Sequence, residues 1–103
     1  MNEMLKQAQR VQERMAELQR DLASRRYEAS SGGGMATAVV SGQLRVLELH
    51  IEPTLVSGGD RSMIEDLATA AINAALEKAQ ASVQQELQQL QGSMMMPGPG
   101  DRG

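Results

Sequence analysis

The sequence contains no cysteine, no phenylalanine and no tryptophan, and it has a single tyrosine, Tyr27, in 103 residues. The absence of cysteine excludes a disulfide framework and thiolate chemistry. Without large aromatics, the core must be formed by Leu, Ile, Val, Met and Ala, and such a core is thin in a chain this small. We therefore expect one domain, residues 1–91, whose core continues across an oligomer interface.

The sequence also lacks the roughly 20 consecutive apolar residues that a membrane-spanning helix needs. Its first ten residues are polar and include an acid, unlike a signal peptide. We therefore expect a cytoplasmic protein with no membrane partner. The formal net charge of −3 argues weakly against nucleic acid as a partner. Net charge is a poor guide to a local basic patch, so the distribution of the basic residues must decide.

Residues 1–24 predict a long helix, because the segment has no Pro or Gly and is rich in good helix formers. Its apolar side chains recur at alternating intervals of three and four residues, which is a heptad seam. The seam consists of Met1, Met4, Ala8, Val11, Met15, Leu18 and Leu22. Because the seam is narrow, we expect this helix to pack along one line only.

Residues 25–52 change to a period of two and predict a three-stranded antiparallel meander. The strands are "RRYEASS", "MATAVVS" and "QLRVLELHI", separated by turns at Gly32–Gly34 and Gly42 and ended by Pro53. In the third strand, Leu47, Leu49 and Ile51 share one face, and Val46, Glu48 and His50 share the other. We expect the first three to be buried on the covered face of the sheet, close to a dimer interface.

Residues 54–61 are expected to form a loop before a second long helix. That helix begins at a cap, either a capping box of Ser62 with Glu65 or the alternative Asp60. Its alanine-rich first half can lie close on the sheet, its second half carries another narrow seam, and it is expected to end at Gly92. The Met-, Pro- and Gly-rich residues 92–103 predict a disordered tail. The predicted fold is α+β, with the element order α-β-β-β-α.

Two candidate chemical motifs do not hold up. The glycines Gly32–Gly34 lack the lysine and the following helix of a phosphate-binding loop, so they are interpreted as a hairpin turn. His50 is the only histidine, and with no cysteine it has too few partners for a zinc site. A catalytic base would also need a pocket and a partner. We therefore expect no enzyme activity, metal, cofactor or small-molecule substrate.

The basic residues are more informative. Lys6, Arg10 and Arg14 recur every four residues, so they line up on the first helix; Arg25 and Arg26 follow its end. The pattern alone favours a solvated helix face, with an acidic stripe of Glu13, Glu17 and Asp21 elsewhere on the helix. The alternative is a ridge that follows phosphates. Without Phe or Trp there is no stacking platform for single strands, so any bound nucleic acid would be double-stranded.

The stretch from Met4 to Met15 resembles the M-L-K-Q-A-Q-x-x-Q-x-x-M opening of the YbaB/EbfC family of bacterial nucleoid-associated proteins. The glycine turn, the break at Gly42 and the ending Ile51-Glu52-Pro53 are also similar to that family. The family's second-helix core is matched by Glu65, Asp66, Leu67, Ala71, Asn73 and Ala75. The resemblance covers nearly the whole chain in the same order.

This resemblance implies a tweezer-shaped homodimer whose helices project from a central joined sheet. It also implies binding of double-stranded DNA, with a structural or regulatory role in the nucleoid and no catalysis. From charge and placement, we predict DNA contacts by Lys6, Arg10, Arg14, Arg25 and Arg26, and dimer contacts by Leu47, Leu49 and Ile51. The alternative is a dimeric coiled-coil adaptor for a protein partner, which the acidic net charge and the Gln-rich seams favour.

Overall fold

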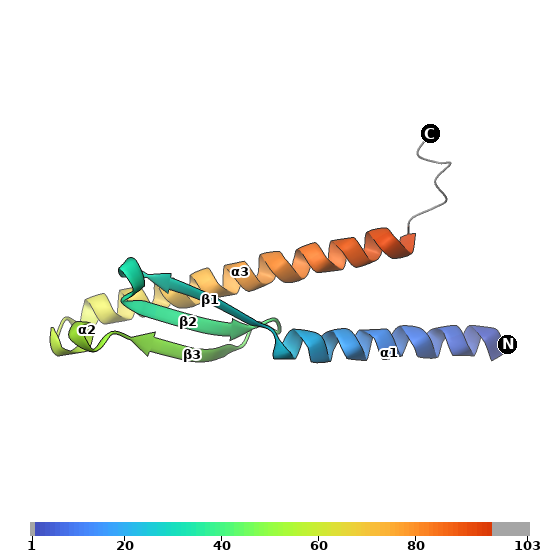
Figure 1. Ribbon diagram of the computed structural model, residues 1–103, viewed down its shortest axis with the longest axis horizontal. Coiled ribbons are helices and arrows are strands. Elements are labelled where there is room, and N and C mark those ends of the chain that lie inside the picture. The colour runs from blue at the N-terminus through green and yellow to red at the C-terminus, as the bar shows by residue number, and fades with distance from the viewer. Residues whose placement is uncertain (1, 96–103) are drawn as a thin grey trace, which may run out of the picture.

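The computed structural model describes residues 2–95, which form two long helices and a three-stranded sheet (Figure 1). The elements are α1 (Asn2–Ser24), β1 (Arg26–Ser31), the short 3-10 turn η1 (Gly32–Gly34), β2 (Ala36–Ser41), β3 (Val46–Ile51), α2 (Pro53–Ser57) and α3 (Arg61–Met95). The sheet is antiparallel with strand order β1-β2-β3. The predicted α+β fold and its meander are confirmed. None of the helices within residues 2–95 has an apolar stretch long enough to cross a membrane.

The boundaries of the helical elements differ from prediction in two places. The expected loop 54–61 contains α2, which starts at Pro53; proline suits the first helical position because its missing N–H would have no partner there. Helix α3 continues through Gly92 to Met95, because one glycine costs only about 1 kcal/mol in a helix interior. The rest of the predicted disordered tail, residues 96–103, lies outside the described residues.

The start of α3 is capped by Asp60, the alternative to the Ser62 capping box. The backbone N–H of Met63 donates to Oδ1 of Asp60 at 3.0 Å. This bond satisfies one of the N–H groups that the first turn of a helix leaves without a partner. The cap fixes where α3 begins after the turn that follows α2.

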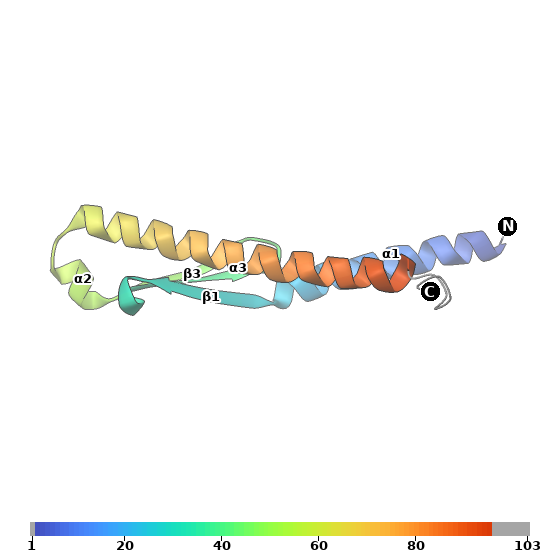
Figure 2. The ribbon, with the colours of Figure 1, turned by 90° about the horizontal axis from the view of Figure 1, so that it is seen from above.

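Helix α3 lies along one face of the sheet, as the view from above shows (Figure 2). It packs mainly on β1 and β2. The core between them is formed by small residues with no exposed surface: Ala36, Ala38 and Val40 from β2, and Ala71, Ala75 and Ala79 from α3. Because these side chains are short, the helix can approach the strands closely. Tyr27, Ala29, Ile51 and Leu67 pack around the edge of this core.

The third strand is not covered by α3, which meets β3 only marginally. The predicted burial of Leu47 and Leu49 is therefore wrong for the single chain, where they are 44% and 42% exposed. Ile51 is half-buried against the core, next to its partner Ala36. The reason is geometric, since one helix is too narrow to cover three strands.

A β-bulge changes which side chains of β3 face α3. The pairing register shifts between Val39 and Val40, so that Val40 pairs with Val46. Residues directly opposite each other in a ladder share a face. Val46 therefore lies on the same face as Val40 and the core, not with Glu48 and His50 as strict alternation predicts. It is also exposed.

Helix α1 and the last turns of α3 extend from the same end of the sheet and diverge (Figure 1). Leu22 is the only buried residue of α1 within Asn2–Ser24. The seam side chains Met4, Val11 and Met15 are exposed. The projecting helix α1 is here called the α1 arm, and the last turns of α3 are called the α3 arm.

Candidate nucleic-acid interface

The outer part of the α1 arm carries the predicted basic row, defined as Lys6, Arg10 and Arg14. All three side chains are exposed. Within the described residues none of them takes part in an ion pair. The row is therefore available to bind anions.

The predicted acidic stripe is not on a separate face. Glu17 follows Arg10 by seven residues, and Asp21 follows Arg14 by the same interval. Seven residues are about two helical turns, so each acid lies on nearly the same side of the helix as the base that precedes it. The outer part of this face therefore carries the basic row together with Glu3, which precedes Arg10 by seven residues, and the part near the sheet carries Glu17 and Asp21.

Arg25 lies at the point where α1 ends and β1 begins, and its guanidinium group is shared by two carboxylates. Nη1 and Nη2 bind both oxygens of Glu86 in α3, with an Nη2–Oε1 distance of 2.8 Å. Nη2 also pairs with Asp21 in the last turns of α1. The Glu86 carboxylate raises the pKa of Arg25 above its ordinary value, and Arg25 in turn holds the pKa of Glu86 below its usual range. The guanidinium group of Arg25 is thus already paired with two carboxylates, those of Asp21 and Glu86.

Arg26 is also paired. It binds Glu48, so the side chains of the two outer strands meet on the sheet face away from α3. His50 Nε2 lies 2.8 Å from the other Glu48 oxygen. Hydrogen bonds from His50 and then from Arg26 hold the pKa of Glu48 below its usual range. Of the five predicted DNA contacts, the structure brings Lys6, Arg10 and Arg14 together and places Arg25 and Arg26 in ion pairs near the sheet.

Other cations are spread along the body. Arg61 pairs with Glu65 one turn later in α3, and Lys78 donates through Nζ to the backbone carbonyl of Glu28 at 3.1 Å. The Lys78 contact joins α3 to β1. No pattern in the sequence shows it, because residues 28 and 78 meet only through the packing of α3 on the sheet.

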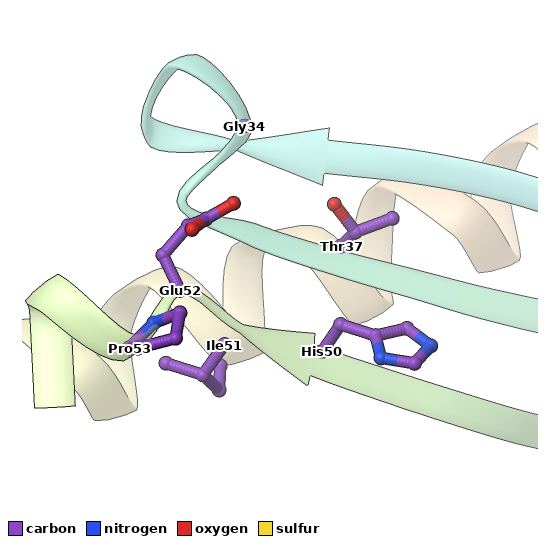
Figure 3. A pocket seen from close by; sticks show the side chains of 6 residues that line it. All are labelled: Gly34, Thr37, His50, Ile51, Glu52 and Pro53. Carbon is purple, nitrogen blue, oxygen red and sulfur yellow. The ribbon is translucent and has the colours of Figure 1, made fainter.

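A hollow of about 250 Å³ lies at the η1 end of the sheet and contains His50, the only histidine of the sequence. It is lined by Gly34, Thr37, His50, Ile51, Glu52 and Pro53 (Figure 3). The figure shows the imidazole of His50 turned away from the Glu52 carboxylate, and His50 is instead bonded to Glu48. In the described part of the chain there is no group of three His, Cys, Asp or Glu side chains that could hold a metal ion.

Apolar side chains of β3 and of the turn before it remain uncovered. Val46, Leu47 and Leu49 are each between 42% and 48% exposed. Leu44, in the β2–β3 turn, is exposed too and has a positive φ of 65°. A branched residue rarely adopts this conformation, which costs about 1–3 kcal/mol. Leu44 and Leu87 line a further hollow of about 360 Å³ between this turn and α3. Leu87 belongs to the narrow seam expected in the second half of this helix, but its proximity to Leu44 is not predicted by the sequence pattern, because the turn and α3 meet only in the fold.

Comparison with known proteins identifies the family. Residues 1–94 match the profile of the YbaB/EbfC DNA-binding family. A nucleoid-associated protein of Clostridium acetobutylicum is 37% identical over 98 residues, covering 95% of this chain and 88% of the relative. One from Anaeromyxobacter sp. is 37% identical, covering 92% of each chain. The crystal structure of an uncharacterized protein from Helicobacter pylori has the same fold, with a TM-score of 0.61 at 18% identity, covering 85% of this chain and 98% of that chain.

Proposed function

The chain belongs to the YbaB/EbfC DNA-binding family, and on that premise we propose that it binds double-stranded DNA as a homodimer in the nucleoid of the cytoplasm. Its role there is structural or regulatory. The observation that supports this most directly is the basic row on the outer α1 arm, whose three cations have no ion-pair partner within residues 2–95. The relatives named above are nucleoid-associated proteins.

Contacts to the phosphate backbone account for the proposed binding. The chain has no Phe or Trp to stack on bases or to wedge between them. Lysine and arginine side chains spaced one turn apart on an exposed helix suit phosphates, and such contacts fix position without reading sequence. We therefore expect similar affinity for duplexes of unrelated sequence.

The homodimer is supported by the apolar surface that the single chain leaves open. Strand β3 lies at the edge of the sheet, and an edge strand that exposes apolar side chains is normally covered. Val46, Leu47 and Leu49 form an exposed row along it. A second copy of the chain that covers this row would bury it, as predicted for the interface, and would present the basic row twice. The dimer then offers up to about 6 phosphate contacts, which corresponds to a log–log salt slope near −5 at most.

A second candidate function, a coiled-coil adaptor for a protein partner, is favoured by one observation. The seam of the α1 arm is uncovered, with Met4 76% and Val11 51% exposed. An adaptor would use this seam to pack against a partner helix and would have no need of the basic row.

A duplex titration separates the two functions. Fluorescence anisotropy with the purified full chain and a labelled duplex is measured at about 50 mM and about 200 mM salt, the range over which phosphate contacts are strongly weakened. The DNA-binding proposal predicts binding at the lower salt and a negative slope on a log–log plot, near −5 at most. Absence of binding at the lower salt would contradict it and favour the adaptor.

A further inference from the structure

The direction of the α1 arm is set within a few residues of its attachment to the sheet. The arm diverges from α3 (Figure 1), and only Leu22 of α1 is buried. Twenty-three residues of helix are about 35 Å long. A change of about 10° at the attachment would therefore move the N-terminal end by about 6 Å. The contacts at the attachment point thus determine where the basic row lies.

On one side of the attachment, the β2–β3 turn is hydrogen-bonded to backbone carbonyl oxygens of α1. The N–H of Gly42, in the β2–β3 turn, donates to the carbonyl oxygen of Leu22 at 2.9 Å, and that of Arg25 donates to the same oxygen at 3.2 Å. The side-chain amide of Gln43 donates to the carbonyl oxygen of Gln19 at 3.3 Å. These bonds join the end of α1 to the sheet but do not reach α3.

The other side is fixed by Arg25. Its guanidinium group binds Asp21 of α1 and both carboxylate oxygens of Glu86 of α3 at the same time. Tyr27 adds a second contact one turn away, because its hydroxyl lies 3.1 Å from Oγ of Ser82. With side-chain exposures of 28% for Arg25 and 39% for Glu86, the pair is partly shielded from water. One side chain therefore joins the two arms where they diverge.

We propose that Arg25 is a positioning residue, which with Asp21 and Glu86 fixes the angle between the α1 arm and the α3 arm. In a dimer this angle sets the spacing of the two basic rows that face a duplex. This consequence for DNA rests on the proposed function. It replaces the prediction that Arg25 contacts phosphate directly.

Electrostatics supports positioning over direct contact. A bidentate arginine–carboxylate pair has charge-assisted hydrogen bonds of fixed geometry. If Arg25 turned to a phosphate, the carboxylates of Glu86 and Asp21 would lose their partner close to the polyanion. That arrangement is unfavourable because like charges repel. Keeping the pair intact avoids this repulsion and preserves the geometry of the arms.

The first test measures the distance between the arms. Since the chain has no cysteine, spin labels can be attached at Gln9→Cys in α1 and Gln88→Cys in α3, which are both exposed positions. Labelled chain is mixed with excess unlabelled chain, so that each dimer holds one labelled protomer. Double electron–electron resonance is expected to give a narrow distribution that broadens or shifts when Glu86→Gln is added. The matched control, Glu77→Gln, removes the same charge from an exposed position of α3 and leaves the distribution unchanged.

The second test uses the sign of the effect on duplex binding. Both Glu86→Gln and Glu77→Gln remove one negative charge, so charge alone predicts slightly tighter binding in each. The positioning role predicts that Glu86→Gln binds duplex about tenfold more weakly. The reason is that the two basic rows of a dimer, held at the wrong spacing, can no longer contact the same duplex at the same time. If Glu86→Gln instead binds as tightly as Glu77→Gln, or more tightly, Arg25 is free to contact DNA and the proposal is overturned.

The two tests distinguish a failure of the positioning role from a failure of the proposed function. If the wild type does not bind duplex, the proposed function fails, and the distance measurement alone decides whether Arg25 holds the arms. Circular dichroism verifies that each variant folds. If Glu86→Gln does not fold, Arg25→Lys takes its place, because lysine keeps the charge but not the two-pronged geometry. A narrow, unshifted distance distribution in Arg25→Lys would then reject the positioning role.

Discussion

The backbone N–H of Gly42 donates to the carbonyl oxygen of Leu22 at 2.9 Å, so the β2–β3 turn rests directly on the end of α1. The turn lies so close to the helix that there is no room for a side chain at position 42. A Cβ atom at position 42 would lie 2.7 Å from the Leu22 oxygen and 3.2 Å from the Leu22 Cα. Both neighbours are backbone atoms, which cannot move aside without moving the helix.

We therefore expect Gly42→Ala to destabilise the protein by about 1–3 kcal/mol, the usual cost of forcing an extra methyl group into a packed site. Thermal unfolding followed by circular dichroism measures the effect. The control is Gly92→Ala, where a Cβ would meet nothing within 4 Å inside α3. That change should stabilise by up to about 1 kcal/mol, because alanine is the better helix former. Equal melting temperatures for the two variants would contradict the close contact.

The alanine contacts between α3 and β2 make a second prediction. Ala75 has no exposed surface and packs in the cluster with Ala36, Ala38 and Val40. Ala75→Leu should destabilise by about 1–3 kcal/mol or more, because the helix must move away from the sheet to admit the larger side chain. Urea unfolding gives the free energy. Ala70→Leu, at an exposed position of the same helix, serves as the control and should change stability by less than about 0.5 kcal/mol.

The features that could be predicted from the sequence are those that depend on neighbours along the chain. The heptad seam of α1 and the alternation of the strands are local, so element order and strand pairing followed from them. The basic row could be placed because all three residues belong to one helix. The bulge at Val39/Val40 could not, since it depends on how two strands pair. The Arg25–Glu86 pair, 61 residues apart, depends on where α3 crosses the sheet.

Exposure of Leu49 in the single chain sharpens the prediction for the interface. Because this side chain is 42% exposed, Leu49→Asp should leave the protomer folded. It should instead break the proposed dimer, since burying an unpaired carboxylate at an interface costs several kcal/mol. Sedimentation velocity is expected to show monomers for Leu49→Asp and dimers for Val56→Asp, a matched change at an exposed apolar residue of α2. A stable dimer of Leu49→Asp would exclude β3 from the interface.

The Arg25–Glu86 pair predicts a pH dependence of stability. The pKa of Glu86 is lowered in the folded chain by its hydrogen bonds from Arg25. Its stabilising contribution is therefore fully present above the unfolded pKa, about 4.3 for a glutamate, and is lost as pH falls through the lower folded pKa. Unfolding free energies of wild type and Glu86→Gln should differ at pH 7 and converge in strong acid. A difference that stays constant across this range would show that the carboxylate charge is not the stabilising element.

The basic row makes the prediction that bears most directly on DNA. Replacing Lys6, Arg10 and Arg14 together by Ala should weaken binding to unrelated duplexes alike, by at least about tenfold, and flatten the salt slope, because fewer counterions are released. Thermal stability should change little, since exposed charges contribute little to folding. The control triple variant replaces Arg45, Arg61 and Lys78, which removes the same charge from the body of the protein. Anisotropy titrations at two salt concentrations compare the two. If the control loses more affinity than the row variant, the DNA surface lies on the body, and the row is only a solvated helix face.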